Sequence, residues 1–296
     1  MCNQAGSVSD ASPANFRIGL GTVYYVNDGS TSNDEWCVAA GSDANDGLSP
    51  GTPKASVQAV LDTYDLEPGD LVRIDTGVYT LTNDITVGAY DGGSTSAPVV
   101  FVASPYGVTF NRGGTGSGNG WSVAAGYVTI TTATSTKYPA LPQSWVKMVG
   151  GARGISLTGG NNRVSRCEVV TNGSYGIYVY SANSTVENCL ARGSGSYGIC
   201  VDSSASGTTV RNNTVAGSGS YGIYSYYGHY AVVTNNIVWA DGTGRYGFYI
   251  GYSGYTPSGW DYNNVFTSNG AKVGYFGGDR ASLTDWRTAT AEMGTV

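Results

Sequence analysis

The sequence predicts an all-β solenoid, in which short parallel strands coil about one long axis. A phrase of the type Tyr-Gly-Ile-Tyr recurs with its glycines at 154, 176, 198, 222 and 247, at intervals of 22, 22, 24 and 25 residues. A repeat of about 20 to 50 residues is typical of chains whose units bury their apolar faces only by stacking on their neighbours. Units this short, and this rich in Gly and β-branched residues, favour strands over paired helices.

A second phrase recurs about ten residues after each copy of the first and marks a corner of the coil. Its last positions are Cys167, Cys189, Asn213, Asn236 and, in a looser fifth copy, Asn264. We expect these side chains to form one column, because Asn can bond along the axis and tolerates the left-handed backbone of a sharp corner.

The cysteines in this column predict stacked thiols. Cys167 and Cys189 should lie one coil apart, at about 4.8 Å along the axis. A disulfide is the alternative, but parallel neighbours in register give poor bridge torsions. The odd total of five cysteines leaves at least one free thiol or an intermolecular pair.

Composition supports strands and turns and excludes several functions. Charged residues are 12% of the chain, about half the usual share, whereas Gly contributes 45 and Tyr 23 of the 296 residues. The net charge of −6 and the four scattered lysines, at 54, 137, 147 and 272, argue against nucleic acid as a partner. No apolar run approaches the roughly 18 residues of a membrane span, so no membrane insertion is expected. Met1 to Leu20 lacks the regions of a signal peptide, so a secreted form would be a mature or excised piece.

The chain before the repeats predicts a helix that covers one end of the solenoid. Residues 1–21 are a polar segment, and residues 22–80 contain a strand, a long loop and a helix that lead into the first coil. Thr52 is the expected N-cap of this helix, with Pro53 at its first position and an apolar stripe at positions 57, 60, 61 and 64. An open solenoid end exposes strand edges and core, which such a helix would cap.

The loop at residues 41–47 raises the question of calcium. Asp43, Asn45 and Asp46 place oxygen ligands before a glycine, as part of a calcium loop does. The distal bidentate Glu is missing, and Asp and Asn also build turns by bonding to nearby backbone. We therefore expect turn structure, no metal site and no cofactor, with calcium left open as the alternative.

Several of these motifs together resemble a known superfamily. They are Tyr24-Tyr-Val26, the 41–47 loop, Thr52-Pro-Lys54, the helix from Val57 to Leu61, Pro68-Gly-Asp70 and Gly77-Val-Tyr79. They look like the opening of many secreted right-handed parallel β-helix proteins of the pectate-lyase-like superfamily. The resemblance covers residues 22–80 by motif and 150–265 by repeat. It implies a right-handed parallel β-helix with an N-terminal capping helix and an extracellular or cell-surface location, but it does not specify an activity.

The remaining boundaries follow from these patterns. Residues 81–280 are expected to form the coils of the β-helix, with residues 132–144 as a loop that projects from one corner. Residues 281–296 are expected to form a short helix or cap, with Ser282 as its N-cap.

The outward tyrosines are the candidate binding residues. Period-two alternation places Ile177 and Val179 in the core and the tyrosines beside them outside, while the glycine of the phrase turns the corner. The candidate carbohydrate-binding residues are therefore Tyr178, Tyr180, Tyr224, Tyr226, Tyr249 and Tyr252. Each ring offers an apolar face and a polar tip, on which a sugar ring can stack. The alternative is that these rings only pack against one another between coils.

Catalytic residues are not identified by any motif. A lyase needs a base, often Lys or Arg, and a cation or metal that neutralises the substrate's carboxylate. Candidates are Lys147, Arg153, Arg166, Arg192, Arg211, Arg245, Asp202, Asp241 and Asp261. The polygalacturonase fingerprint has no match, and the single histidine, His229, lies in a Tyr-Gly-rich loop and is expected to be inert.

Two functional hypotheses follow. The first is an extracellular β-helix module that binds polysaccharide, or acts as a cell-surface scaffold, through its Tyr-rich face. The second is a polysaccharide lyase or glycoside hydrolase of the pectate-lyase-like superfamily. The sequence identifies neither a glycan nor an oligomeric state.

Overall fold

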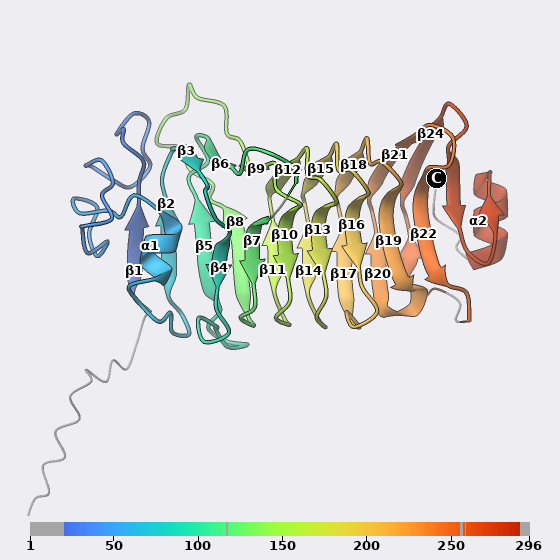
Figure 1. The fold of residues 1–296 in the computed structure, drawn as a ribbon, viewed down its shortest axis with the longest axis horizontal. Coiled ribbons are helices and arrows are strands. Elements are labelled where there is room, and N and C mark those ends of the chain that lie inside the picture. The colour runs from blue at the N-terminus through green and yellow to red at the C-terminus, as the bar shows by residue number, and fades with distance from the viewer. Residues whose placement is uncertain (1–20, 117, 255–256, 258, 291–296) are drawn as a thin grey trace, which may run out of the picture.

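The computed structural model is a single long solenoid built from three parallel β-sheets (Figure 1). It describes residues 21–290 except 117, 255–256 and 258. Each regular coil contributes one strand to each sheet in turn, as in β13 (Tyr175–Val179), β14 (Thr185–Glu187) and β15 (Leu190–Arg192). The predicted all-β solenoid is therefore confirmed.

The three sheets are named A, B and C throughout. Sheet A contains β1 (Val23–Val26), β2 (Leu71–Ile74), β5 (Val99–Ala103), β8 (Val128–Thr132), β11 (Arg163–Ser165), β14, β17 (Thr208–Arg211), β20 (Ala231–Thr234) and β23 (Trp260–Asp261). Sheet B contains β3 (Gly77–Thr80), β6 (Val108–Asn111), β9 (Val146–Val149), β12 (Cys167–Val170), β15, β18 (Thr214–Ala216), β21 (Ile237–Asp241) and β24 (Asn264–Ser268). Sheet C contains β4 (Ile85–Val87), β7 (Asn119–Val123), β10 (Arg153–Leu157), β13, β16 (Tyr197–Val201), β19 (Tyr221–Tyr227), β22 (Tyr246–Tyr252), β25 (Lys272–Tyr275) and the antiparallel β26 (Asp279–Arg280).

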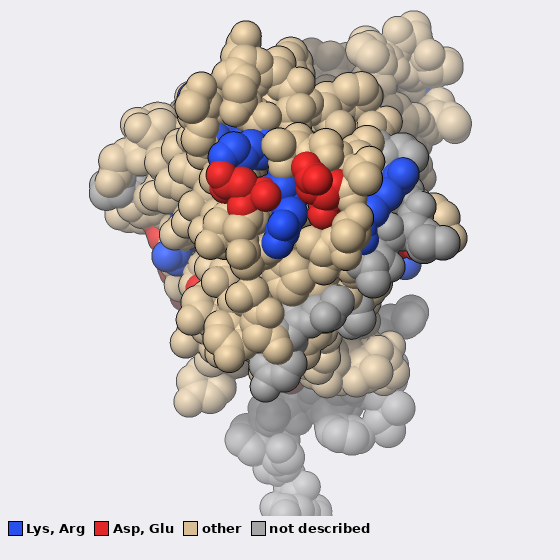
Figure 2. All heavy atoms as spheres, turned by 90° about the vertical axis from the view of Figure 1, so that its right-hand side faces the viewer, with Lys and Arg blue, Asp and Glu red and all other residues tan. Residues whose placement is uncertain are grey.

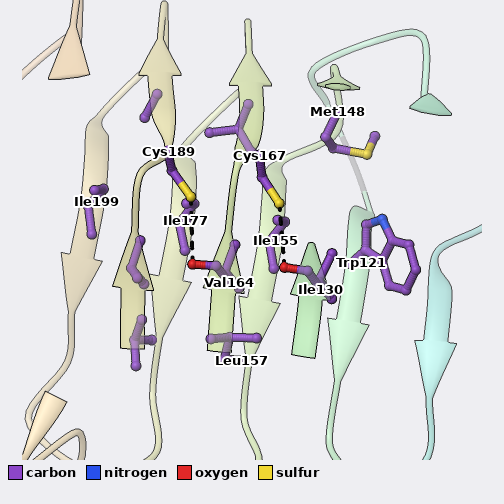
Figure 3. Packing of buried hydrophobic residues seen from close by; sticks show 14 of the residues in the cluster. Trp121, Ile130, Met148, Ile155, Leu157, Val164, Cys167, Ile177, Cys189 and Ile199 are labelled. Atoms are coloured by element: carbon purple, nitrogen blue, oxygen red, sulfur yellow. Dashed lines mark hydrogen bonds between the residues drawn. The ribbon is translucent and has the colours of Figure 1, made fainter. Parts of the chain in front are cut away.

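The core consists of columns of like residues, one from each coil. Ile155, Ile177 and Ile199 are paired in register along sheet C and are fully enclosed. Figure 3 shows these side chains pointing into the interior toward residues of the other sheets. Burying one such side chain contributes roughly 1.5–3 kcal/mol, so the recurring Ile and Val positions of the phrase drive the stacking of coils.

The cysteines of the core are free thiols, as the repeat spacing predicted. Cys167 and Cys189 are buried and unbridged. Their thiols donate to the carbonyl oxygens of Ile130 and Val164, at 3.8 and 3.6 Å (Figure 3). Burial raises the pKa of the Cys167 thiol well above its usual range, so it stays protonated.

The corner between sheets A and B carries an asparagine ladder, but its fifth member was predicted wrongly. Nδ2 of Asn213 donates to Oδ1 of Asn236, and Nδ2 of Asn236 donates to Oδ1 of Asn263, at 3.0 and 2.9 Å. Asn263, and not Asn264, is thus the next rung. Asn264 instead begins strand β24.

The ladder and the left-handed backbone belong to different residues. The positive φ angles lie one position before each rung, at Arg166, Asn188, Asn212, Asn235 and Tyr262. The rungs themselves are buried and supply hydrogen bonds to the neighbouring coil. The expectation that one Asn would serve both purposes is therefore corrected.

The expected N-terminal helix exists but begins later than predicted. Helix α1 (Val57–Leu61) is capped by Ser56, whose hydroxyl accepts from the amide of Ala59 at 3.1 Å, and not by Thr52. Val57 and Val60 are buried, and the helix contacts β1 and β4. That α1 closes the end of the solenoid stays a prediction.

The carboxylates of the 41–47 loop form turns. Oδ1 of Asp43 accepts from the amides of Ala55 and Ser56 at 2.9 and 3.1 Å. Oδ1 of Asp46 accepts from the amide of Leu48 and the hydroxyl of Thr52. These contacts are those of the turn interpretation, and the absence of a metal or cofactor stays a prediction.

The loop between β8 and β9 projects from the solenoid, as expected (Figure 1). Hydrogen bonds from two of its residues hold it in place. The ammonium of Lys137 donates to the carbonyl oxygens of Asp34 and Glu35 at 2.6 and 2.7 Å. The hydroxyl of Tyr138 also donates to the carbonyl oxygen of Asp34. The loop is thus tied to the N-terminal region of the chain.

The C-terminal end is closed by helix α2 (Leu283–Thr290). Ser282 caps it as predicted, since its hydroxyl accepts from the amide of Asp285 at 3.1 Å. Trp286 is buried, and its ring lies 5.4 Å from that of Phe248 and 6.1 Å from that of Trp260. Figure 2 shows acidic and basic side chains gathered side by side on this end of the molecule. The apolar core therefore ends under α2, beneath a charged outer surface.

Candidate functional site

Two columns of aromatic residues cover the outer face of sheet C. Strand pairing places one column in the order Arg153, Tyr175, Tyr197, Tyr221, Tyr246 and Lys272. It places the second in the order Ser156, Tyr178, Cys200, Tyr224, Tyr249 and Tyr275. We call the eight tyrosines of these columns the tyrosine face.

The rings of the tyrosine face stack both along and between the columns. Within the first column, the ring of Tyr197 lies 5.0 Å from Tyr175 and 4.7 Å from Tyr221, nearly parallel to both. Between the columns, Tyr221 stacks on Tyr249 at 4.0 Å and Tyr197 on Tyr224 at 4.9 Å. Aromatic pairs contribute about 0.5–1.5 kcal/mol beyond their buried area, so the face is a rigid platform that also stabilises the coils.

The sequence pattern did not predict that the first column faces outward, because the glycine of each phrase interrupts the period-two alternation of the strand. A Cβ on Gly198 would lie 2.2 Å from Cγ1 of the core residue Val215 and 2.9 Å from the carbonyl oxygen of Gly222. The glycine therefore faces the core, as the following Ile199 does, and the tyrosines on both sides of this pair face outward. The glycine lies within the strand and does not turn the corner, which corrects that expectation.

This close approach gives a testable prediction. Gly198→Ala is expected to lower the free energy of unfolding by about 1–3 kcal/mol, because the new methyl group overpacks the core against Val215. Gly29→Ala is the matched control, since a Cβ added to Gly29 would meet no other atom within 4 Å and the φ of Gly29 is not positive. Urea denaturation of both variants checks this, and equal midpoints would contradict the proposed packing role.

The predicted site residues differ in their exposure. Tyr180, Tyr226 and Tyr252 are open to solvent, with exposed fractions of 44, 39 and 45%. Tyr224 and Tyr249 are half-buried. Tyr178 is 9% exposed because Tyr175, Tyr180 and the Arg153 guanidinium cover its ring. The structure thus brings five of the six to the outer side of sheet C, with Tyr178 packed among its neighbours. Tyr252 instead pairs with Tyr227 at the end of the strand, two positions after the core residue Ile250, and its ring lies 5.4 Å from that of Tyr227.

Charged groups lie at both ends of the first column. The Arg153 guanidinium lies 4.1 Å from the ring centroid of Tyr178 and 5.4 Å from that of Tyr175, in cation–π geometry. At the other end, Lys272 is 5.7 Å from the ring of Tyr246 and forms an ion pair with Asp279. The tyrosine face is therefore bracketed by two cations.

Burial and hydrogen bonds raise the pKa of three phenols of the face, those of Tyr178, Tyr246 and Tyr249. Burial, followed by the hydrogen bond that its hydroxyl donates to Oδ2 of Asp202 at 3.0 Å, raises the pKa of Tyr178. Burial raises the pKa of Tyr249 to about 12, and the hydrogen bond to Asp279 raises the pKa of Tyr246 to about 12. A phenolate base is therefore not available here at neutral pH.

Three of the nine charged catalytic candidates, Lys147, Arg192 and Arg211, belong to ion-pair ladders on other sheets. Glu168 lies between Lys147 and Arg192 on sheet B. Glu187 lies between Arg163 and Arg211 on sheet A, and these two guanidinium groups lower its pKa against the effect of burial. These pairs link neighbouring coils, so their positions on the outer faces are explained without catalysis.

The other candidates are dispersed, with one exception. Asp241 accepts from Ser268 and Asn269 at the end of strand β21, Arg166 occupies a corner, and Arg245 and Asp261 lie elsewhere in the coils. Arg153 and Asp202 are brought together on either side of Tyr178, one over its ring and one at its hydroxyl. Across the described residues, no three His, Cys, Asp or Glu side chains are placed to hold a metal ion.

Comparison with known proteins agrees with this architecture. A family model described as a right handed beta helix region matches residues 145–285. The structure resembles that of the pectate lyase Pel9A, with a TM-score of 0.59, 17% identity and coverage of 87% of this chain and 63% of that one. It also resembles a rhamnogalacturonan lyase, with a TM-score of 0.51, 15% identity and coverage of 84% and 68% of the two chains. No curated protein sequence matches the chain significantly.

These likenesses define the class of protein at the level of fold. The chain is a parallel β-solenoid with three sheets. More particularly, residues 145–285 match the model of a right handed beta helix region, and the fold resembles that of the pectate lyase Pel9A. It spans 63% of the length of the pectate lyase that it resembles. Within the described part of the chain, no helix is both long enough and apolar enough to cross a membrane.

Proposed function

We propose that this chain is an extracellular β-helix module that binds a polysaccharide along the outer face of sheet C. The observation that carries the proposal is the continuous stack of Tyr rings, flanked by the exposed rings of Tyr180 and Tyr226. A sugar ring stacks on such a surface through its apolar face, and the phenol hydroxyls supply hydrogen bonds. Fixed rings lose little conformational entropy on binding, which favours affinity.

The charges at the ends of the face favour a glycan with acidic groups. Arg153 and Lys272 stand at opposite ends of one column, five coil steps apart in the strand pairing. Carboxylates of a bound chain would be attracted to Arg153, and near Lys272 they would compete with Asp279 for the ammonium. Salt would weaken both attractions. The names of the two similar structures, a pectate lyase and a rhamnogalacturonan lyase, are consistent with a polysaccharide as the ligand.

One observation favours a second candidate, a polysaccharide lyase or glycoside hydrolase. Arg153 and Asp202 meet at Tyr178, which gives one cation and one carboxylate at a single point of the face. The phenol of Tyr178 is held protonated, so the base would have to come from Asp202 or Arg153. Release of unsaturated or reducing ends from acidic and neutral polysaccharides, with calcium supplied, would support this candidate over simple binding.

Binding is tested with variants of the exposed rings, which should fold normally. The double variant Tyr180→Ala/Tyr226→Ala is expected to lose affinity for polygalacturonate or alginate by about ten-fold or more in affinity electrophoresis. Tyr90→Ala is the matched control, because Tyr90 is 92% exposed and lies outside the tyrosine face. If every gel that retards the wild type retards the double variant to the same extent, binding through these rings is ruled out.

A further inference from the structure

A second aromatic surface lies on the outer side of sheet B. Ile237, Trp239 and Phe266 have exposed fractions of 46, 53 and 54%. Strand pairing places Ala216, Trp239 and Phe266 at successive positions of one column. This surface shares no strand with the tyrosine face, which lies on sheet C.

The indole of Trp239 is held in place by a chain of hydrogen bonds. Its Nε1 donates to Oγ of Ser268 at 3.2 Å, and this hydroxyl donates to Oδ1 of Asp241 at 2.6 Å. Nδ2 of Asn269 donates to the same Oδ1 at 2.7 Å. An exposed tryptophan fixed in this way presents a rigid ring, because its rotamer is set before any ligand arrives.

A hollow of about 240 Å³ lies against this ring. It arises because Ala216 stands between Arg192 and Trp239 in the strand pairing, so a short side chain separates two long ones. Gly217 and Asp241 also line the hollow. At roughly 30 Å³ per water molecule the hollow holds about eight waters, which is the scale of a single sugar unit.

The groups around the hollow have opposite charges. Arg192 lies on one side, where its Nε is paired with Glu168 at 2.9 Å. Asp241 also lines the hollow, and hydrogen bonds from Ser268 and Asn269 lower its pKa, so it is ionised at neutral pH. In the described part of the chain its Oδ2 receives no hydrogen bond, so this oxygen can accept from a ligand hydroxyl. A cation and an anion beside one aromatic ring suit a neutral ligand that has many hydroxyl groups.

An apolar groove continues the surface on the other side of the same ring. This groove of about 540 Å³ shares Ala216 and Trp239 with the hollow and extends to Ile237 and Phe266. A chain of sugar units is longer than one ring and would need such an extension. An apolar protein side chain inserted beside Trp239 would leave Oδ2 of Asp241 without a hydrogen-bond donor.

We propose that the hollow between Arg192 and Trp239 is a second carbohydrate subsite, which takes a neutral pyranose unit of a glycan. The apolar face of the sugar stacks on the indole, and its hydroxyls bond to Asp241 and to the free edge of Arg192. The proposal stands apart from binding at the tyrosine face, because it uses other residues on another sheet and a ligand without charge. If both sites act, one molecule holds two glycan segments at once. Its overall affinity for a material that presents both segments then exceeds the affinity of either site alone.

The test is affinity electrophoresis in gels that contain neutral polysaccharides, namely a galactomannan, a xyloglucan and a β-1,3-glucan. We expect at least one of them to retard the wild-type chain, and Trp239→Ala to lower the affinity by about ten-fold or more. Ala216→Phe should have the same effect, since it fills the hollow without removing a polar contact. Trp145→Ala is the matched control, because Trp145 is 40% exposed and does not line the hollow.

Three results would overturn the proposal. One is the absence of retardation by all three neutral gels. Another is equal retardation of the wild type, Trp239→Ala and Ala216→Phe. The third is concentration-dependent self-association of the wild type in sedimentation velocity that Trp239→Ala abolishes, since the surface would then be a contact between two copies. The Tyr180→Ala/Tyr226→Ala variant should bind neutral gels normally, which separates failure here from failure at the tyrosine face.

Discussion

Replacing Asn236 with alanine is expected to lower the free energy of unfolding by roughly 3 kcal/mol or more. Asn236 is buried at the middle of the ladder, where its Oδ1 accepts from both the amide and Nδ2 of Asn213. Its own Nδ2 donates to the carbonyl oxygen of Val210 and to Oδ1 of Asn263. Alanine would leave several of these buried groups unpaired, and each costs about 1–3 kcal/mol.

Asn264→Ala is the matched control for this ladder variant. Asn264 is the same residue type at the same corner, but the ladder hydrogen bonds pass through Asn263. Its replacement is expected to change the free energy of unfolding by only about 0.5 kcal/mol. The midpoints of urea denaturation measure the stability of both variants. A larger loss of stability for Asn264→Ala than for Asn236→Ala would mean that the ladder residues are wrongly assigned.

Replacing Trp286 with alanine is expected to have the other large effect, a loss of roughly 3–5 kcal/mol. The ring fills the C-terminal end of the core against Phe248 and Trp260. It also lies so close to Gly274 that a Cβ there would be 2.3 Å from the indole. Without the indole, α2 keeps only the smaller contacts of Leu283 and Ala289 with the core. The strand edges and core that this exposes should promote self-association.

Two measurements check this expectation. Urea denaturation should show the loss of stability, and sedimentation velocity should show larger species for Trp286→Ala than for the wild type. Trp145→Ala removes an indole that is 40% exposed and should leave both measurements nearly unchanged. If Trp286→Ala remained monomeric and as stable as this control, the role of α2 as a plug on the core would be refuted.

The coil architecture could be predicted from the sequence because its causes are periodic. The Ile residues at 155, 177 and 199 recur with the spacing of the phrase, and the structure pairs them in register. The buried thiols of Cys167 and Cys189 followed from the same periodicity. A feature that repeats in every coil is visible in a sequence because each copy supports the interpretation of the others.

The errors arose where a local detail departs from the repeat. The alternation rule failed at Gly198, which faces the core beside Ile199, so the tyrosine before it was not expected to face outward. The fifth ladder residue could have been found from a different signal. An apolar residue precedes each rung by three positions, as Val233 precedes Asn236, and Trp260 stands in the same relation to Asn263.

The surface around Trp239 had no signal in the sequence. Its hollow depends on the short side chain of Ala216 lying beside Arg192 and Trp239, which are far apart along the chain. Only the pairing of β15, β18 and β21 brings these three residues together. Such a site is a property of the stack and not of any one repeat.

The corner between sheets A and B has a consequence for how this chain tolerates insertions. The spacing from the apolar residue to the rung stays at three positions, as in Val186 to Cys189 and Val210 to Asn213, although the repeat length varies. The two additional residues of the third interval lie between β16 and β17, on the opposite side of sheet A. Segments grafted at that turn should therefore leave the coil phase intact, whereas a single residue added at the ladder corner would displace every strand after it.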